Sequence, residues 1–378
     1  MRKSNAILQA IKRARKAEDG SPDVPKTWEQ MTVPDHFRRT VRNDQFLVVE
    51  ESSGPDKESK ILIFCSNEQK ALLDGSDYWV ADGTFEVVEN TLFAQLFVIH
   101  ALSPVGITVP CLYVLLPDKE LSSYQRVFQY LRSEGVKQPG CFKADFEQGI
   151  YKAYRNVYPG AAVVLCDAHF KRALRRKLAS LGLTSLYTSN ESLQVLIRYI
   201  WGLSLAPIDQ IVPLWEDFIR VKYEEMSESD AFEGEDEAVD EWIGYFERTY
   251  VGALNWRTGN RKQPLYPHEV WNKNKSILSD DPTTTNSAEG YNNALKSSLP
   301  RNNSIWTLLK QLQKEENSNH LKLRDVALGQ QNNQSTSPNS SRNLARAQRQ
   351  QDLKGLVSNF ANMSTKMWMA SVVDFYNS

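Results

Sequence analysis

Apolar and polar positions follow a regular pattern between residues 78 and 166. Three apolar runs of strand length come first, at residues 78–82, 92–102 and 108–116. Helical and strand patterns then alternate, as a helix at 122–133, a strand at 141–145, a helix at 146–158 and a strand at 161–166. Three strands followed by helix, strand, helix and strand predict an α/β fold with a ribonuclease H-like mixed sheet.

Weaker patterns flank this region. Those before it predict a small α/β lead-in, with strands at 46–49 and 61–64, a helix at 67–73 and a polar loop at 51–59. Those after it predict a helix at 306–316 and a disordered polar linker at 331–342. The last segment, 343–378, ends in apolar residues, so it would either dock on the body of the protein or mediate dimerisation.

Composition fits an ordinary globular protein, with 41% hydrophobic and 24% charged residues among 378. The basic, amphipathic start of the chain has no continuous apolar core, so it does not resemble a secretory signal. No apolar run approaches the roughly 20 residues of a membrane helix, and we expect no membrane partner. The four cysteines are widely spaced, which favours a reduced intracellular compartment: Cys65, Cys111, Cys141 and Cys166.

Charge is unevenly distributed, although the net charge is only −1. Basic residues gather in the first 16 positions, which read as a helix, while an acidic block runs from Glu216 to Glu241. A second basic cluster follows the predicted strand 161–166 and comprises Lys171, Arg172, Arg175 and Arg176. Such clusters bind phosphates in nucleic-acid-binding proteins, but they also occur as solvated helix faces.

Two acidic residues end predicted strands. Asp82 ends the first strand of the regular pattern, where Gly83 breaks the run, and Asp145 ends the fourth. In the predicted topology these strands are neighbours, so the two carboxylates would converge and repel unless a divalent cation neutralised them. Both residues also have a structural interpretation. Asp82 suits a turn beside Gly83, and Asp145 suits a helix N-cap with Gln148 three positions later.

A third acidic residue lies on a predicted helix far downstream. The apolar stripe of that helix consists of Ala288, Tyr291, Leu295 and Leu299, and Glu289 lies beside it on the first turn. Asn286 and Glu289 also have the spacing of a capping box, which is the alternative interpretation of Glu289. Its position after the last strand favours a place beside Asp82 and Asp145.

Several ordered motifs resemble the Mutator-like element (MULE) transposases. They are ADGTFEVV around Asp82, QLFVIHAL, VPCLYVLLPDK, FKADFEQGI around Asp145, LCDAHFKRAL, and TTTNSAEGYNNALK around Glu289. The resemblance runs from about residue 28 to residue 312. It implies that Asp82, Asp145 and Glu289 form a DDE triad and that Cys166 and His169 match the family's Cys-x-x-His element.

The resemblance also implies a domain organisation in which a helical insertion separates the fifth strand of the regular pattern from the Glu-bearing helix. The expected segments are a basic N-terminal helix and linker (1–27), the lead-in (28–77), the first part of the catalytic domain (78–179), the helical insertion (180–279), closing catalytic helices (280–330), the linker (331–342) and the C-terminal segment (343–378).

Phosphodiester chemistry supplies a reason for three carboxylates. Two divalent ions about 3.5–4 Å apart can activate a nucleophile and stabilise a leaving oxygen. Mg²⁺ suits all-oxygen ligation and Mn²⁺ would substitute for it. We hypothesise that Asp82 bridges the two ions, while Asp145 completes one site and Glu289 the other. The expected partners are double-stranded DNA, as transposon ends and target, and further copies of the chain.

Two function classes follow from these features. The first is a nuclear DNA transposase that cuts and joins DNA ends. The second is a domesticated or decayed derivative that binds DNA or protein partners without catalysis. Cys166 and His169 supply only half of a tetrahedral zinc site, which favours local packing and hydrogen bonding over zinc. Most aromatic residues of the insertion would form its core, and Trp256 and Trp271 are candidates for stacking on a base.

Overall fold

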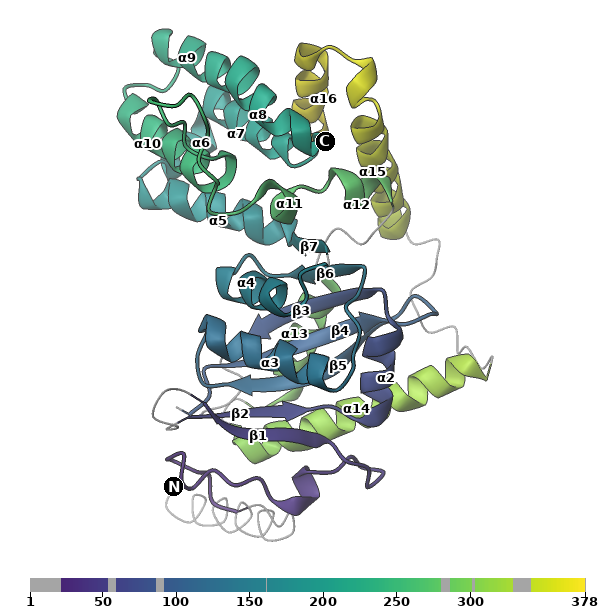
Figure 1. The fold of residues 1–378 in the computed structure, drawn as a ribbon. Coiled ribbons are helices and arrows are strands. Elements are labelled where there is room, and N and C mark those ends of the chain that lie inside the picture. Colours follow the sequence, from purple (N-terminus) through teal and green to yellow (C-terminus); the bar gives the residue numbers. More distant parts are fainter. Residues whose placement is uncertain are drawn as a thin grey trace, which may run out of the picture. The chain divides into compact units, whose positions relative to one another are not determined.

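The computed structural model describes residues 22–53, 59–85, 92–160, 162–279, 286–300, 303–328 and 341–377. These residues form an α/β fold with a seven-stranded sheet in the order β1-β2-β5-β4-β3-β6-β7 (Figure 1). The strands are β1 (Leu47–Ser53), β2 (Ser59–Phe64), β3 (Tyr78–Thr84), β4 (Gln95–Leu102), β5 (Thr108–Leu116), β6 (Cys141–Ala144) and β7 (Ala162–Leu165). The predicted strands of the regular pattern are therefore confirmed, and β3 and β6 are neighbours in the sheet.

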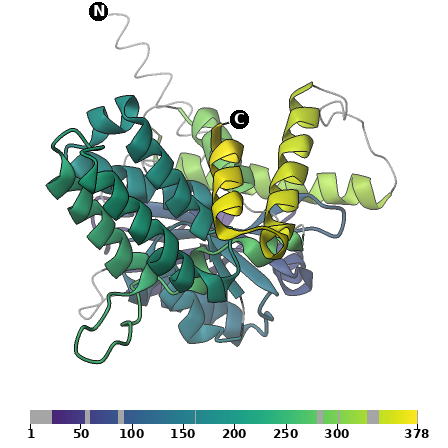
Figure 2. The ribbon, with the colours of Figure 1, turned by 90° about the horizontal axis from the view of Figure 1, so that it is seen from above.

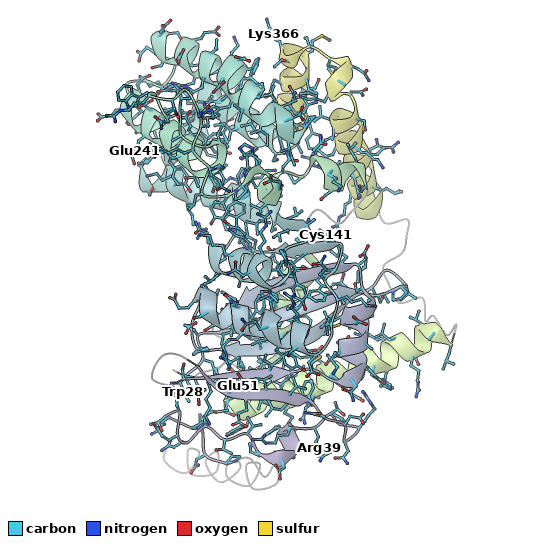
Figure 3. All side chains as sticks on the ribbon, viewed as in Figure 1. Trp28, Arg39, Glu51, Cys141, Glu241 and Lys366 are labelled. Carbon is cyan, nitrogen blue, oxygen red and sulfur yellow. The ribbon has the colours of Figure 1, made fainter. Side chains whose placement is uncertain are left out.

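The chain divides into two compact units, and the division passes through β6. Unit 1 comprises Met1–Phe142, Glu147–Ala161 and Asn286–Gln331. Unit 2 comprises Lys143–Phe146, Ala162–Thr285 and Asn332–Ser378. Cys141, labelled in Figure 3, begins β6 on the unit 1 side of the division.

Unit 1 holds five complete strands of the sheet between two layers of helices. Its helices are the 3₁₀ helix η1 (Asp35–Phe37), α2 (Asn67–Gly75), α3 (Leu121–Ser133), α4 (Gln148–Val157), α13 (Asn286–Ser298) and α14 (Ile305–Ala327). Figure 1 shows α3 and α4 on the near face of the sheet, with α13 and α14 behind it. The lead-in strands join this same sheet, because β2 pairs antiparallel with β5 as well as with β1.

Alternation along the strands decides what each face of the sheet buries. Strands β3, β4 and β5 pair antiparallel, and Asp82 lies opposite Val98. On one face, Phe97 packs edge-on against Phe128 of α3. On the other, Leu96 and Val98 belong to a core that includes α14. Because neighbouring residues of a strand point to opposite faces, β4 is apolar on both sides and is central to the fold.

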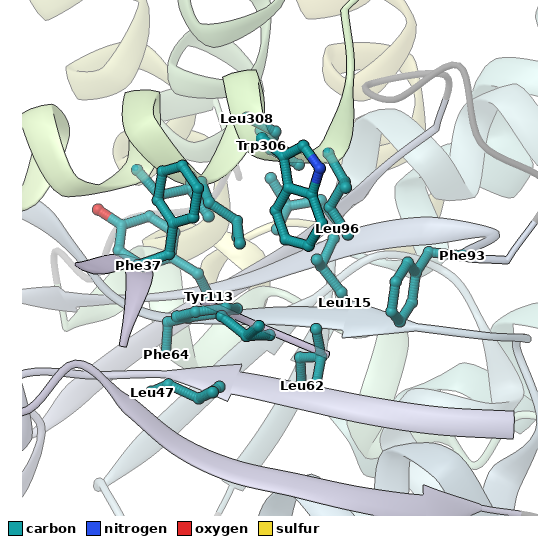
Figure 4. Packing of buried hydrophobic residues seen from close by; sticks show 14 of the residues in the cluster. Phe37, Leu47, Leu62, Phe64, Phe93, Leu96, Tyr113, Leu115, Trp306 and Leu308 are labelled. Carbon is teal, nitrogen blue, oxygen red and sulfur yellow. The ribbon is translucent and has the colours of Figure 1, made fainter. Parts of the chain in front are cut away.

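The core behind the sheet joins the N-terminal segment to α14. Trp306 of α14 stacks on Phe37 of η1 with ring centroids 5.8 Å apart, and both side chains are buried (Figure 4). Sheet residues Leu62, Tyr113 and Leu115 pack in the same cluster. Phe37 and Trp306 are 269 positions apart by the difference of their residue numbers. Leu295 of α13 belongs to the same cluster, so apolar burial holds both α13 and α14 against the sheet.

Some predicted boundaries are wrong. Asp82 and Gly83 lie inside β3 rather than at its end, because Gly83 pairs with Phe97 of β4. The predicted loop 51–59 is too long at both ends, since β1 continues to Ser53 and β2 begins at Ser59. The expected N-terminal helix and residues 331–340 of the expected linker lie outside the described residues.

Unit 2 is largely helical. Its elements after β7 are α5 (Asp167–Ser180), α6 (Thr184–Ser189), α7 (Glu191–Leu203), the 3₁₀ helix η2 (Ile208–Gln210), α8 (Ile211–Leu214), the π-helix η3 (Trp215–Arg220), α9 (Val221–Glu228), α10 (Asp236–Phe246), the π-helix η4 (Glu247–Val251), α11 (His268–Trp271), α12 (Asn274–Leu278), α15 (Ser341–Ser358), the 3₁₀ helix η5 (Phe360–Asn362) and α16 (Thr365–Asn377). None of the helices in the described residues is long and apolar enough to cross a bilayer.

Aromatic residues form much of the core of unit 2, as predicted. The buried rings include Trp201, Trp215, Phe218, Tyr223, Trp242, Phe246 and Tyr250. The C-terminal segment packs on this core. Figure 2 shows α15 and α16, in yellow, joined by a short turn. Val372 of α16 lies against Gly202 of α7, and Tyr376 packs edge-on against Trp201, so the segment docks on the helical insertion.

Candidate active site

Asp82 is a buried carboxylate on the face of β3 that meets α13. Tyr78 and Val80 of β3 pack with Ala288 of α13 in a small buried cluster. Asp82 shares their face, because it lies two and four residues further along the same strand. Only 5% of the surface of Asp82 is exposed. A charged group this deeply buried requires compensation by hydrogen bonds, an opposite charge or a metal ion.

Asn292 of α13 supplies one such hydrogen bond. Its Nδ2 donates to Asp82 Oδ2 at 2.7 Å, and Asn292 is itself buried, with 4% of its surface exposed. Asn292 is not among the residues predicted from the sequence. One signal was available: Asn292 follows Ala288 by four positions, which places a polar side chain on the buried stripe of the helix.

Glu289 lies one helical turn before Asn292. Residues three apart on a helix are neighbours on its surface, so Glu289 and Asn292 occupy the same side of α13. Glu289 is half-buried, between the buried Ala288 and the exposed Gly290. The structure therefore brings Asp82 together with the helix that carries Glu289, 207 positions downstream by the difference of their residue numbers. The capping-box alternative depends on the side chain of Asn286, which is outside the described residues.

Asp145 immediately follows β6 and belongs to unit 2. Its Oδ1 lies 3.2 Å from Nδ1 of His169, and both side chains are largely buried. The N-cap interpretation of Asp145 is wrong, because α4 begins at Gln148 and Glu147 occupies the N-cap position. Asp145 is thus not needed to start that helix.

Two contacts in unit 2 position the backbone around Asp145. Cys166 donates its backbone N–H to the carbonyl oxygen of Ala144 at 2.9 Å, which places the end of β7 beside the end of β6. On the other side of Asp145, the ring centroid of Phe146 lies 4.4 Å from that of Tyr266 and 5.6 Å from that of Phe170. The backbone at Asp145 is therefore fixed by a sheet hydrogen bond on one side and by an aromatic cluster on the other.

Helix α5 carries the predicted basic cluster. Arg172, Arg175 and Arg176 are exposed, and Arg175 lies over the ring of Trp201 at 5.5 Å. Lys171 is more enclosed, with its Nζ 4.3 Å from the centre of the Tyr376 ring. The arginines can therefore meet a solvent-borne anion directly, whereas Lys171 is already surrounded by protein.

Lys171 belongs to a buried ion cluster with Asp167 and Lys273. Asp167 lies 3.1 Å from Lys171 and 2.5 Å from Lys273. Desolvation acts to raise the pKa of Asp167, but the charges of Lys273 and Lys171 outweigh it and lower that pKa to about 2. Desolvation and the charge of Lys273 lower the pKa of Lys171 to about 8. One carboxylate cannot neutralise two ammonium groups, so the closer Lys273 is the main partner of Asp167.

The two tryptophans proposed to stack on a base have opposite environments. Trp271 is 1% exposed and stacks on Phe170, so it cannot contact a ligand, and that prediction is wrong. Trp256 is 81% exposed, and Arg257 lies 4.9 Å from its ring centre. Trp256 lies in the loop that follows Gly252. Gly252 has a φ of +103°, and a Cβ placed on it would collide with the carbonyl oxygen of Lys262, so only glycine fits there. Trp256 therefore remains available for stacking.

Comparison with known proteins identifies one part of the chain. Residues 78–173 match the family model of the MULE transposase domain. The match includes Asp82, Asp145, Cys166 and His169, and it confirms the resemblance to Mutator-like element transposases over this stretch. A search of curated proteins found no match.

Proposed function

We propose that this chain is a DDE transposase, a metal-dependent enzyme that cuts and joins transposon DNA ends. The hydrogen bond from Asn292 to Asp82 is the observation that carries the proposal, because it joins the Glu289 helix to a strand inside the matched domain. A ribonuclease H-like topology agrees with the strand order, in which three antiparallel strands precede β6 and β3 neighbours β6.

The donor set fits divalent cations of the hard, oxygen-preferring kind. Asp82, Asp145 and Glu289 offer only carboxylate oxygens, and Mg²⁺ and Mn²⁺ bind such groups well. Asp82 is buried, so a nearby cation would offset the cost of desolvating its charge. We propose that these three residues hold two Mg²⁺ ions. When bound, such ions would activate the attacking oxygen and stabilise the leaving oxygen of a phosphodiester.

The chain's own residues would position the DNA. Arg172, Arg175 and Arg176 lie exposed on α5 and can pair with backbone phosphates without losing an existing ion pair among the described contacts. His169 lies beside Asp145 and would hold its carboxylate in place. We further propose that the protein acts in the nucleus, where its DNA substrates would lie, and that it forms a homo-oligomer with one copy at each of the two DNA ends.

A cleavage assay with full-length protein tests this function. Supercoiled plasmid is incubated with Mg²⁺, Mn²⁺ or EDTA, and the nicked form is measured for wild type, Asp82→Asn, Asp145→Asn and Glu289→Gln. Each substitution keeps the side-chain shape but removes a charge, and we expect nicking to fall roughly 100-fold or more. Glu120→Gln is the matched control, since Glu120 is exposed and its side chain caps no helix.

The results separate the two function classes. Metal-dependent nicking that is lost in all three variants and kept in Glu120→Gln would support the transposase. Salt-sensitive plasmid binding without nicking by the wild type would instead favour a DNA-binding derivative that has lost catalysis.

A further inference from the structure

The side-chain oxygen of Asn292, Oδ1, has an unusual environment. A carboxylate accepts hydrogen bonds, so Asn292 must direct its Nδ2 toward Asp82, as it does at 2.7 Å. This orientation leaves Oδ1 of Asn292 buried, with no hydrogen-bond donor among the described residues. A buried carbonyl oxygen without a donor is unfavourable and uncommon in folded proteins.

Packing prevents the Asn292 side chain from turning toward solvent, where water could donate to Oδ1. Ala288 and Leu295, on the same side of α13, are both fully buried, and Ala288 contacts Tyr78 and Val80 of β3. Asn292 therefore cannot turn to solvent without moving the helix. An apolar side chain would fill the same space without an unsatisfied oxygen, so packing alone does not account for an amide at this position.

We propose that Asn292 is part of the metal site, where Nδ2 fixes the Asp82 carboxylate and Oδ1 is a neutral oxygen donor to the cation or its bound water. Amide oxygens are ordinary ligands of hard cations. Groups that orient a ligating carboxylate also control metal affinity. The inference rests on the proposed function, because it requires Asp82 to be a metal ligand, and it adds a neutral donor to the three carboxylates.

Two substitutions distinguish a metal-site residue from a structural one. Asn292→Leu removes both the N–H donor and the oxygen ligand atom and replaces the amide with a branched apolar group of similar shape. Asn292→Asp keeps two oxygens but removes the N–H donor and places a second negative charge against Asp82. Like charges at this distance repel, so the metal-free variant should be destabilised, and a divalent cation should offset the repulsion.

The experiment measures Mn²⁺ binding to full-length protein by the electron paramagnetic resonance signal of free Mn²⁺, together with melting temperature with and without Mn²⁺. We expect Asn292→Leu to weaken Mn²⁺ binding about 10–100-fold. For Asn292→Asp we expect a lower melting temperature without metal and a larger rise on adding Mn²⁺ than for wild type. Asn293→Leu and Asn293→Asp are matched controls, because Asn293 is the next residue and is exposed.

Each remaining outcome has a definite meaning. The inference is overturned if Asn292→Leu binds Mn²⁺ as tightly as wild type, or if Asn292→Asp gains no more stability from Mn²⁺ than wild type does. If Asn292→Leu does not fold, the response of Asn292→Asp still decides. Loss of Mn²⁺ binding in Asp82→Asn, with unchanged binding in both Asn292 variants, would reject the inference alone. If wild type and Asp82→Asn bind Mn²⁺ equally, the proposed metal site also fails.

Discussion

Nδ1 of His169 lies 3.2 Å from Oδ1 of Asp145. The two residues come from different elements of unit 2, since Asp145 follows β6 and His169 lies on the first turn of α5. We propose that the Cys-x-x-His element positions Asp145, because the backbone N–H of Cys166 pairs the end of β7 with the end of β6 and His169 lies against the Asp145 carboxylate.

Substitution of His169 tests that role. We expect His169→Ala to reduce metal-dependent nicking about 10–100-fold, because Asp145 loses a partner that orients it. His169→Asn should retain most activity, since the amide nitrogen of Asn can occupy the place of Nδ1. The measurement is the nicking rate at saturating Mn²⁺. A structural zinc site would give a different result, namely stoichiometric zinc in the purified protein and loss of folding in both variants.

The exposed arginines of α5 should contribute to DNA affinity by pairing with phosphates. For Arg172→Gln combined with Arg176→Gln, we expect weaker binding to duplex DNA of any sequence. We also expect the slope of log affinity against log salt to become shallower, by about 0.9 for each phosphate that the variant no longer neutralises. Fluorescence anisotropy at several salt concentrations measures both quantities.

Lys177 provides the control for these arginines. It lies on the same helix, but its Nζ is 2.9 Å from Glu241 of α10, which is labelled in Figure 3. Because Glu241 already compensates this charge, Lys177→Gln should change DNA affinity little. Equal reductions in affinity for Lys177→Gln and for the arginine variants would argue against a specific DNA surface on α5.

The close approach of α7 and α16 makes a stability prediction. A Cβ on Gly202 would lie 3.0 Å from Cγ1 of the buried Val372. Gly202→Val should therefore destabilise unit 2 by about 1–3 kcal/mol through overpacking. Adding Val372→Ala should relieve the clash, so the double variant should be more stable than the sum of the two single effects by about 1 kcal/mol. Urea unfolding of all four proteins measures this coupling.

A glycine on α15 serves as the reference for that test. No atom lies within 4 Å of a Cβ placed on Gly355. Gly355→Ala should be neutral or stabilise the helix by up to about 1 kcal/mol. Additive effects of Gly202→Val and Val372→Ala, within about 0.5 kcal/mol, would show that α16 does not pack on α7 in solution.

The ion cluster at Asp167 predicts a dependence of stability on pH. The folded state lowers the pKa of Asp167 from 3.8 to about 2, because Lys273 and Lys171 favour its charged form over the opposing effect of desolvation. A depressed acid stabilises the fold above its unfolded pKa, and this stabilisation, about 2 kcal/mol, is lost as pH falls from about 4 to about 2.

Asp167→Asn isolates this contribution from those of other carboxylates. The difference in unfolding free energy between wild type and Asp167→Asn should be constant from pH 7 to pH 4.5 and should shrink below pH 4. Urea unfolding across this range measures it. A difference that stays constant down to pH 2.5 would mean that the lysines do not stabilise the charged carboxylate.

Local patterns along the sequence were sufficient for much of unit 1. Strands β4 and β5 and helix α3 are long, and their apolar periods are unambiguous, so their types and most of their limits follow from the residues themselves. The limits of β3 do not follow from its residues alone. Asp82 and Gly83 favour a turn by local preference, but pairing with Val98 and Phe97 on β4 keeps them in the strand.

The sequence by itself determined the order of the elements and the resemblance to MULE transposases, and it singled out Asp82, Asp145 and Glu289 as candidates, because these inferences depend on residue types and spacing. Only the tertiary structure revealed Asn292 beside Asp82, the burial of Trp271 and the ion pair between Lys273 and Asp167. Each of these depends on contacts between residues far apart or on different elements. A local pattern can indicate which side of an element is buried, but it does not state which partner a side chain meets there.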